Sequence, residues 1–238
     1  MVLVTGGGTG IGKATASAFI ANGATVVITG RRQPVLEATT QSLGAQAHYI
    51  AGDVSKNGEA ARIIEETVDK FGQLDILVNN AGTGAMGPLS QTSDEEIERI
   101  YRTNVFGPLA LAREATTHLA NSNGSIVNIS SVAASGVMPG VVTYASSKAA
   151  VDHATRNLAA ELGPIGVRVN AVAPGLTDTD ITADVKSNEQ MLGMIIAQTP
   201  MGRLGKPKDI ANAVLLLADN RAGWVTGQIV QAGGGFLL

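Results

Sequence analysis

Tyr144 and Lys148 place a phenol and an ammonium group four residues apart along the chain. In a helix, that spacing puts both side chains on one face. A free phenol has a pKa near ~10 and is a weak base at neutral pH, but a neighbouring ammonium group lowers that pKa. The pair is therefore predicted to exchange a proton with an alcohol or a forming alkoxide. An ordinary pair on a helix surface has the same spacing, so the motif alone leaves that alternative open.

Ser131 is the first residue after the apolar run 125–130, so we expect it at the carboxyl end of a strand. There its hydroxyl can donate a hydrogen bond to a substrate oxygen and stabilise developing negative charge. Ser130 is predicted to face the other way, because side chains alternate along a strand.

Asn104 lies in the stretch 94–119, which is predicted to form one long helix. Pro108, four residues later, has no N–H, so the Asn104 carbonyl loses its helical donor. A buried unpaired carbonyl needs another partner, often water. Asn104 is therefore a candidate water-binding residue, and the alternative is a kinked helix without a chemical role.

A glycine-rich loop follows the first apolar run, Val2–Thr5, and precedes a helical pattern. Glycines at such a junction let the backbone approach a pyrophosphate that binds at the helix N-terminus. The order of strand, loop and helix therefore predicts a dinucleotide site. Its expected contacts in the loop are Gly6, Thr9, Gly10, Ile11 and Gly12.

The second apolar run, 25–29, is followed by Gly30, Arg31 and Arg32. Enzymes that use NAD place an acidic residue at this point, where it binds the ribose 2′-hydroxyl. Gly30 stands there instead, and a guanidinium group next to it matches a phosphate dianion. The sequence thus favours NADP. The alternative is that both arginines are solvated at a helix start and that the cofactor is NAD.

The third and fourth apolar runs are followed by residues that we also expect beside the dinucleotide, since ligands bind at the carboxyl ends of strands. These residues are Asp53, Val54, Asn80, Ala81 and Gly82. Asp53 is a candidate acceptor for the adenine amino group. The alternative for Asp53 is a turn cap before the helix that follows Ser55.

Seven short apolar runs, most of them without polar alternation, are typical of strands buried on both faces of a parallel sheet. They are 2–5, 25–29, 47–51, 76–79, 125–130, 167–173 and 228–231. Six helical patterns separate them, over 11–22, 34–43, 58–71, 94–119, 143–162 and 208–219. This alternation predicts the α/β class, with a doubly wound parallel sheet in a single domain over residues 1–238.

The irregular stretch 175–205 is long and includes an apolar helical pattern over 189–198. Long connections of this kind are often functional, and this one is predicted to be a substrate lid at about 176–205. The alternative is an ordinary surface helix packed on the domain.

The composition excludes several classes of protein. A formal charge of −3 gives no basic face for nucleic acid. The chain has no cysteine and only three scattered histidines, so we expect neither a disulfide nor a metal site. The densest apolar run, 213–218, is far shorter than the ~18 residues of a membrane span. With no signal-peptide pattern either, we expect a cytoplasmic protein that does not enter a membrane.

Taken together, these motifs resemble those of the short-chain dehydrogenases/reductases, and the likeness extends over nearly the whole chain. The motifs are Thr5-Gly6-x-x-x-Gly10-x-Gly12, Asn79-Asn80-Ala81-Gly82, Asn104, Ser131, Tyr144-x-x-x-Lys148 and Pro174-Gly175. The resemblance implies a seven-stranded Rossmann sheet in the order 3-2-1-4-5-6-7, and commonly a homotetramer.

The resemblance also implies a role for each residue. Tyr144 would be the acid and base, and Lys148 would bind the nicotinamide ribose and tune the tyrosine. Ser131 would orient the substrate carbonyl, and Asn104 would hold a water that links Lys148 to solvent. The implied contacts beside the nicotinamide carboxamide are Pro174, Gly175, Thr177 and Thr179. Thr177 stands where the family usually has Ile or Val.

The expected function is hydride transfer between NADPH and a ketone, as in 3-oxoacyl thioester reductases or broad carbonyl reductases. One alternative is the same chemistry with NAD, and another is a non-catalytic dinucleotide-binding protein. Substrate contacts are expected from the stretch 176–196 and from Thr83, Met86, Val132, Ala133, Met138 and Val141. Because these residues are small or apolar, they favour a neutral, modestly apolar ketone as the small-molecule substrate.

Overall fold

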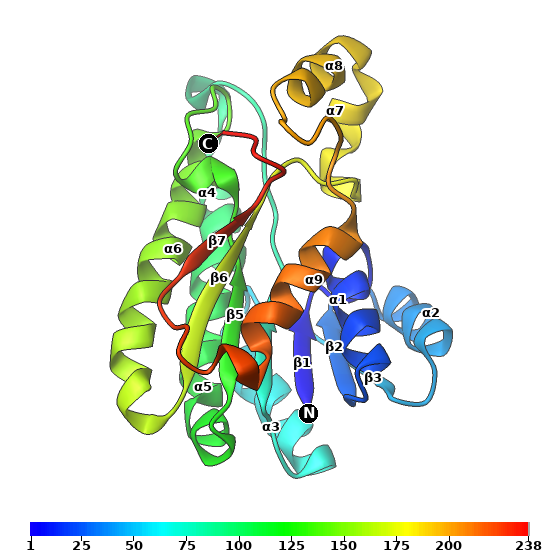
Figure 1. Ribbon diagram of the computed structural model, residues 1–238, viewed down its shortest axis with the longest axis vertical. Helices are drawn as coiled ribbons and strands as arrows, with labels where there is room; N and C mark the ends of the chain where they lie inside the picture. The colour runs from blue at the N-terminus through cyan, green and yellow to red at the C-terminus, as the bar shows by residue number, and fades with distance from the viewer. Residues whose placement is uncertain (238) are drawn as a thin grey trace.

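Seven parallel strands form one sheet in the order β3-β2-β1-β4-β5-β6-β7 (Figure 1). This computed structural model describes residues 1–237 and, for Ile181 and Asp184, the backbone alone. The strands are β1 Val2–Thr5, β2 Val26–Gly30, β3 Ala47–Ala51, β4 Ile76–Asn79, β5 Ser125–Ile129, β6 Arg168–Pro174 and β7 Ile229–Ala232. Every strand lies within one residue of its predicted range, and the predicted class and strand order are confirmed.

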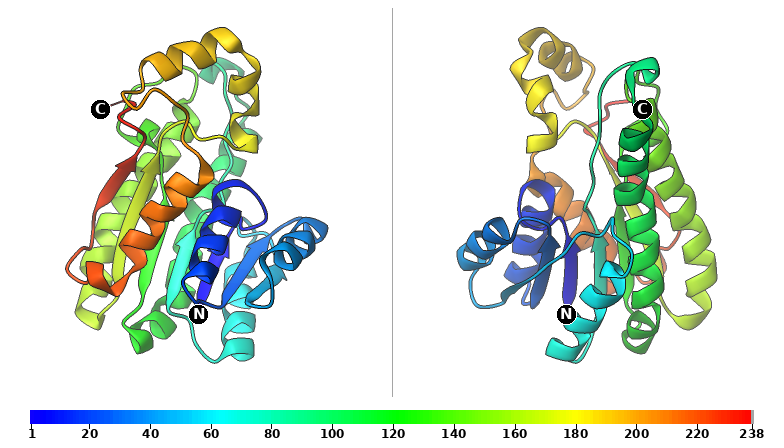
Figure 2. Two further views of the ribbon diagram at one scale, coloured as in Figure 1. Left: turned by 45° about the vertical axis from the view of Figure 1, so that its right-hand side comes forward. Right: turned by 180° about the vertical axis from the view of Figure 1, so that it is seen from behind.

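Helices cover both faces of the sheet. They are α1 Gly10–Ala21, α2 Gln33–Leu43, α3 Glu59–Phe71, α4 Asp94–Tyr101, α5 Gly107–Ser122, α6 Val142–Leu162, α7 Ala183–Ser187, α8 Glu189–Ala197 and α9 Pro207–Ala218. Buried apolar residues of α3, α5 and α6 pack on one face, and those of α1, α2 and α9 pack on the other. Figure 1 looks onto α1 and α9, and the right-hand view of Figure 2 looks onto α5 and α6. Because apolar side chains cover both faces, the strands have few polar positions.

The predicted helix over 94–119 is not one regular helix, and its distortion lies at Asn104, where Pro108 predicted it. It is divided by a π-helical segment, η2 Arg102–Phe106, which lies between α4 and α5. The Gly107 N–H donates to the Arg102 carbonyl, five residues back, and Pro108 has no N–H to offer. The proline thus shifts the local hydrogen-bond register, and Asn104 lies in the middle of the wide turn.

The stretch after β6 rises beyond the carboxyl ends of the strands and carries α7 and α8 (Figures 1 and 2). Its buried residues Val185 and Ile195 pack with Val132, which follows β5, and with Phe236 near the end of the chain. The apolar helix predicted over 189–198 is thereby confirmed as a helix. Among the described residues, no helix combines the length and the apolar character that a membrane crossing requires.

Candidate active site

The glycine loop joins the end of β1 to the first turn of α1. Thr9 precedes the helix in an extended conformation and makes no side-chain cap, so the first N–H groups of α1 are not capped by it. Gly10 has a φ of +52°, and a Cβ added at Gly12 would lie 2.3 Å from the Gly6 carbonyl oxygen. Only glycine fits these two positions. The loop is therefore a backbone-lined cradle at a helix N-terminus, which suits a pyrophosphate.

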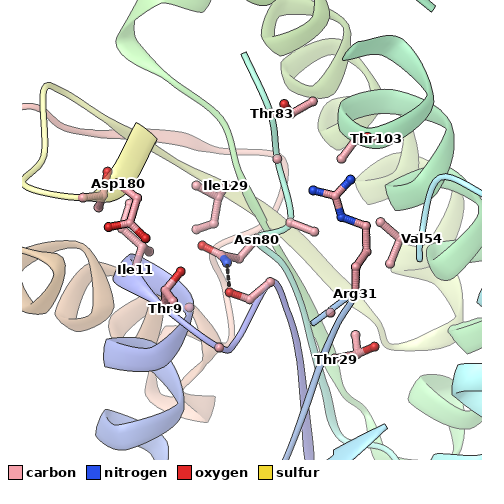
Figure 3. A pocket seen from close by; sticks show the side chains of 18 of the residues that line it. Thr9, Ile11, Thr29, Arg31, Val54, Asn80, Thr83, Thr103, Ile129 and Asp180 are labelled. Carbon is pink, nitrogen blue, oxygen red and sulfur yellow. Dashed lines mark hydrogen bonds between the residues drawn. The ribbon is translucent and has the colours of Figure 1, made fainter. Parts of the chain in front are cut away.

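The end of β1 also holds the end of β4 in place. The Thr5 hydroxyl oxygen accepts from the Asn80 N–H at 2.9 Å and from the Ala81 N–H at 2.8 Å. The Asn80 side-chain amide donates in return to the carbonyls of Thr5 and Gly6, at 2.8 and 3.2 Å. Figure 3 shows Asn80 against the loop. Two of the motifs found in the sequence are thus one hydrogen-bonded unit.

One cavity of about 360 Å³ runs along the carboxyl ends of the strands. It is lined by every predicted cofactor contact, namely Gly6, Thr9, Gly10, Ile11, Gly12, Arg31, Arg32, Asp53, Val54, Asn80, Ala81, Gly82, Tyr144, Lys148, Pro174, Gly175, Thr177 and Thr179. Ser131 lines the same cavity. Ser130 lines the cavity as well, although strand alternation predicted that it faces the other way from Ser131. Gly30, Asp180 and Thr182, from segments that the sequence indicated, also line it. Lining residues that the sequence did not indicate are Gly8, Thr29, Val35, Leu36, Gly52, Thr103 and Ile129. Most of these adjoin a strand end, which was the available signal.

Arg31 and Arg32 are both exposed and lie at the wall of the cavity that follows β2. Figure 3 shows the Arg31 guanidinium reaching across the cavity towards Thr103 and Val54. Within residues 1–237, neither arginine forms an ion pair. Two unpaired guanidinium groups beside a backbone-lined cradle suit a ligand that carries an additional phosphate.

Asp53 has the role that the sequence left as its alternative. Its Oδ1 accepts from the Ser55 N–H at 3.1 Å and from the Ser55 hydroxyl at 2.7 Å, which closes a turn after β3. Asp53 also lines the cavity. The turn cap and a contact with adenine are therefore compatible, since the cap uses one carboxylate oxygen.

Tyr144 and Lys148 lie one turn apart on α6, and Ser131 meets them from the end of β5. Burial raises the pKa of the Tyr144 phenol, and its hydrogen bond with Ser131 offsets part of that rise. The sequence predicted a lowered pKa for Tyr144, and for the protein without cofactor this prediction is wrong. The phenol is desolvated, and the Lys148 Nζ lies 5.8 Å from the centre of its ring.

Lys148 is buried, and its Nζ donates to the Ile129 carbonyl at 2.7 Å. Burial lowers the pKa of Lys148 to about 8, and the Asp152 carboxylate counteracts this. The pKa of the Lys148 ammonium group therefore lies close to neutral pH. Such a group responds to small changes in nearby charge.

Asn104 is buried behind this pair and connects two segments. Its Oδ1 accepts from the Thr83 N–H at 2.9 Å, and its Nδ2 donates to the Thr83 carbonyl at 2.8 Å and to the Ser147 hydroxyl at 3.0 Å. Ser147 in turn donates to the Tyr144 carbonyl at 2.7 Å. A Cβ added at Gly82 would lie 3.5 Å from both the Asn104 Oδ1 and the Lys148 Nζ. Sequence spacing gave no signal for Ser147 or for this linkage.

The predicted substrate contacts do not gather in one place. Thr83 lines the main cavity, whereas Met86 and Val141 line a separate cavity of about 110 Å³. Val132 and Met138 pack into the apolar cluster under α7 and α8, and Ala133 is buried next to Val132.

A cation that the sequence reasoning overlooked lies beside the Thr83 segment. Arg99 donates to the Thr83 hydroxyl and, at 3.5 Å, to the Gly84 carbonyl.

Among the described residues, no group of three or more His, Asp or Glu side chains is arranged to hold a metal ion.

The family model described as enoyl-(acyl carrier protein) reductase matches residues 6–237. The 7alpha-hydroxysteroid dehydrogenase of Escherichia coli is 38% identical and covers 98% of this chain and 92% of its own. A 3-oxoacyl-(acyl-carrier-protein) reductase of Thermotoga maritima is 34% identical, over 99% of this chain and 97% of its own. A solved structure from Beutenbergia cavernae superposes with a TM-score of 0.94 at 34% identity, over 99% of this chain and 96% of its own. That protein is assigned as an NAD(P)-dependent gluconate 5-dehydrogenase and holds NADP at low occupancy.

Proposed function

The chain belongs to the short-chain dehydrogenase/reductase family of oxidoreductases, and on that basis we propose that it interconverts a ketone and a secondary alcohol with NADP(H). The observation that carries the proposal is one cavity in which the backbone cradle, two unpaired arginines and the Tyr144, Lys148 and Ser131 side chains all meet. A nicotinamide dinucleotide fits this arrangement because the cradle has no room for side chains and ends at a helix N-terminus. When bound, such a cofactor supplies or accepts the hydride.

The residues of the chain supply the proton and the oxygen-binding groups. In the reducing direction, Tyr144 donates its phenolic proton to the forming alkoxide, and Ser131 donates a hydrogen bond to the same oxygen. The raised pKa of Tyr144 keeps the phenol protonated at neutral pH, which suits a proton donor. The Lys148 ammonium then stabilises the phenolate until it is reprotonated. Asn104 lies next to Lys148 and is proposed to hold a water that connects the site to solvent.

The preference for NADP rests on Arg31 and Arg32, which are free of ion pairs among the described residues and directly follow Gly30, where an acidic residue would bind a 2′-hydroxyl. Arg31→Asp is expected to weaken NADPH binding at least about tenfold, because a hydrogen bond to a charged group contributes about 1.5–3 kcal/mol. NADH binding is expected to fall much less. Arg113→Asp, which changes an exposed arginine outside the cavity, is the matched control. Equal NADPH binding by the Arg31 variant and the wild type would contradict the NADP assignment.

The function is tested by fluorescence titration with NADPH and NADH, followed by a panel of ketones with the preferred cofactor. Tight NADPH binding with turnover of a ketone supports the proposal. Preference for NADH would favour the alternative of the same chemistry with NAD. Binding without any turnover would favour a non-catalytic dinucleotide-binding protein, although the four positions Asn104, Ser131, Tyr144 and Lys148 are all filled.

The proposed substrate is a neutral, modestly apolar ketone. Relatives named for a hydroxysteroid and for a 3-oxoacyl group are consistent with a ketone or secondary alcohol as the substrate. We also propose that the stretch 176–205 is a substrate lid, because α7 and α8 stand over the edge of the sheet at which the cavity opens. Thr177, Thr179 and Asp180, which belong to this stretch, line the cavity.

A homotetramer is part of the proposal. Several large apolar side chains are exposed, and Trp224 is fully exposed. The others include Phe106 and Leu109, at and after the π segment, and Leu216 on α9. Burial of such side chains between subunits would remove apolar surface from water. Light scattering after size-exclusion chromatography tests the assembly, and a monomer at micromolar concentration would contradict it. The proposal retains the cytoplasm as the expected location.

A further inference from the structure

Asp152 is a buried carboxyl group that the proposed reaction does not use. It lies on α6, four residues after Lys148, and its residue is 9% exposed while Lys148 is 5% exposed. Its Oδ1 is fully buried and has no hydrogen-bond partner among the described residues. A buried carboxylate oxygen without a partner is costly, so its presence behind Lys148 needs an explanation.

The explanation lies in a polar stripe of α6. The stripe consists of Tyr144, Ser147, Lys148, Asp152 and Thr155. Where it faces β5, polar groups replace the usual apolar packing: Asn128 donates to the Thr155 hydroxyl at 2.9 Å, and Ser130 donates to the Lys148 carbonyl at 3.5 Å. Burial raises the pKa of the Asp152 carboxyl, and the nearby Ser130 hydroxyl opposes part of that rise. Asp152 therefore lies within the same buried polar region as the Lys148 ammonium.

We propose that Asp152 is a positioning residue whose buried carboxylate provides the counter-charge that keeps the Lys148 ammonium charged. Through Lys148, Asp152 sets the pH range in which Tyr144 transfers a proton, a consequence that rests on the proposed function. Asp152 acts through Lys148 and is not assigned any contact with substrate or cofactor.

The surrounding charges support this role for Asp152. Two cations act on the Asp152 carboxyl, Lys148 one turn before it and Arg156 one turn after it. For Lys148, the carboxylate of Asp152 is the charge that opposes the lowering of its pKa by burial. The segments packed against this part of α6 present neutral polar groups, namely Ser130 after β5 and Asn104 in η2.

The ionisable residues of the elements packed against α6 act on neither pKa. They are Arg168 of β6, Arg102 of η2, and Asp94, Glu95, Glu96, Glu98, Arg99 and Tyr101 of α4. On α6 itself, His153 and Glu161 are exposed and also act on neither group. Asp152 is thus the negative charge that Lys148 senses within the part of the chain that the structure describes.

The direct test is an NMR titration of the cofactor-free protein labelled with ¹³Cε-lysine, in which the Lys148 signal is assigned by its loss in Lys148→Met. The wild-type midpoint is expected at about 8. Asp152→Asn is expected to move it down by about half a pH unit or more, and the control Glu161→Gln, on the exposed face of the same helix, is expected to leave it in place. Equal midpoints in Asp152→Asn and wild type would overturn the proposal.

A second variant keeps the test decisive if Asp152→Asn does not fold. Asp152→Ser also removes the carboxylate and leaves a smaller polar side chain, so the Lys148 midpoint is again expected to fall by about half a pH unit or more. An unchanged midpoint in folded Asp152→Ser would then overturn the proposal.

The consequence for turnover is measured separately, as kcat/KM for ketone reduction against pH. The alkaline limb of the Asp152→Asn profile is expected at lower pH than in the wild type and in Glu161→Gln. If the wild type reduces no ketone, the proposed function fails while the NMR titration still decides the role of Asp152. If turnover depends on Tyr144 but the Asp152→Asn profile does not move, the role of Asp152 fails and the function stands.

Discussion

The glycine loop lines the same cavity as Tyr144 and Lys148 of the polar stripe of α6, and the two regions are built in opposite ways. In the loop, side chains are absent because backbone atoms already fill the space, as at Gly12, where a Cβ would lie 2.3 Å from a carbonyl oxygen. In the stripe, polar side chains such as Ser147 and Lys148 are present although they are buried. Cofactor binding therefore depends on the absence of side chains from the loop. Proton transfer depends on polar side chains of α6 that are costly to bury. Adding atoms should damage the first region, and removing them should damage the second.

The largest effect is expected where the stripe loses its charge. Lys148→Met removes the ammonium that stabilises the Tyr144 phenolate, and groups that support proton transfer contribute about 100- to 10,000-fold. We expect kcat for ketone reduction to fall about 1,000-fold in steady-state assays. Lys70→Met, which changes a lysine on α3 outside the cavity, should retain wild-type turnover. If kcat falls less than about tenfold in Lys148→Met, Lys148 does not support the proton transfer.

The next largest effect is expected where the loop gains an atom. Gly12→Ala places a methyl group against the Gly6 carbonyl and 2.5 Å from the Asn80 side-chain nitrogen. Overpacking of this kind costs about 1–3 kcal/mol, so NADPH affinity should fall by about 50-fold in a fluorescence titration. Gly163→Ala is the control, because a Cβ there meets nothing within 4 Å. If Gly12→Ala binds NADPH as tightly as the wild type, the loop can hold a methyl group at this position, which contradicts our account of the loop.

A smaller effect is expected at Gly84, a glycine that packs against the Tyr144 ring of the polar stripe. A Cβ at Gly84 would lie 3.2 Å from the Tyr144 Cδ2, which is tight enough to displace the ring by a few tenths of an ångström. Gly84→Ala should lower kcat by about tenfold while leaving NADPH affinity unchanged, because rate is sensitive to small displacements of a catalytic group. If affinity falls with kcat, the substitution disturbs the cradle, and the two regions are less separable than we infer.

The smallest effect concerns stability. The pKa of folded Lys148 is about 8, against an ordinary value of 10.5, so between these values the unfolded chain binds more protons than the folded chain. Stability contributed by this group therefore rises with pH through that window, and below pH 8 the folded state bears the full cost of the buried charge. Lys148→Met should be more stable than the wild type by about 1 kcal/mol at pH 7, since the lost hydrogen bond to Ile129 offsets part of the gain. Urea denaturation should show this difference shrinking towards pH 10, and a difference that grows with pH would contradict the assignment.

The sequence was a good guide to the cradle because its residues follow strand ends. Parallel topology gathers those ends at one edge, so Gly12, Arg31, Asn80 and Thr179 line one cavity although they are far apart along the chain. Pro108 likewise predicted a local distortion at Asn104, which the structure has as a π segment.

The stripe was less predictable because its properties depend on burial and on packing between distant segments. Sequence spacing indicated that Lys148 would lower the pKa of Tyr144, but desolvation raises it. The hydrogen bond from Asn104 to Ser147 joins residues 43 positions apart, and neither motif predicts it. Val132 appeared to be a substrate contact by its place after β5, but it packs into an apolar cluster with Phe236 from the end of the chain.

The most direct test measures binding and hydride transfer in one sample of Tyr144→Phe. NADPH affinity comes from fluorescence titration, and the rate comes from stopped-flow oxidation of the bound NADPH by a ketone that the wild type reduces. We predict an affinity within about twofold of the wild type and a rate at least about 100-fold lower, because the variant lacks only the phenolic hydroxyl group that donates the proton. A variant that transfers hydride at the wild-type rate would contradict the role of Tyr144, and a variant that loses affinity and rate together would contradict the separation of the two regions.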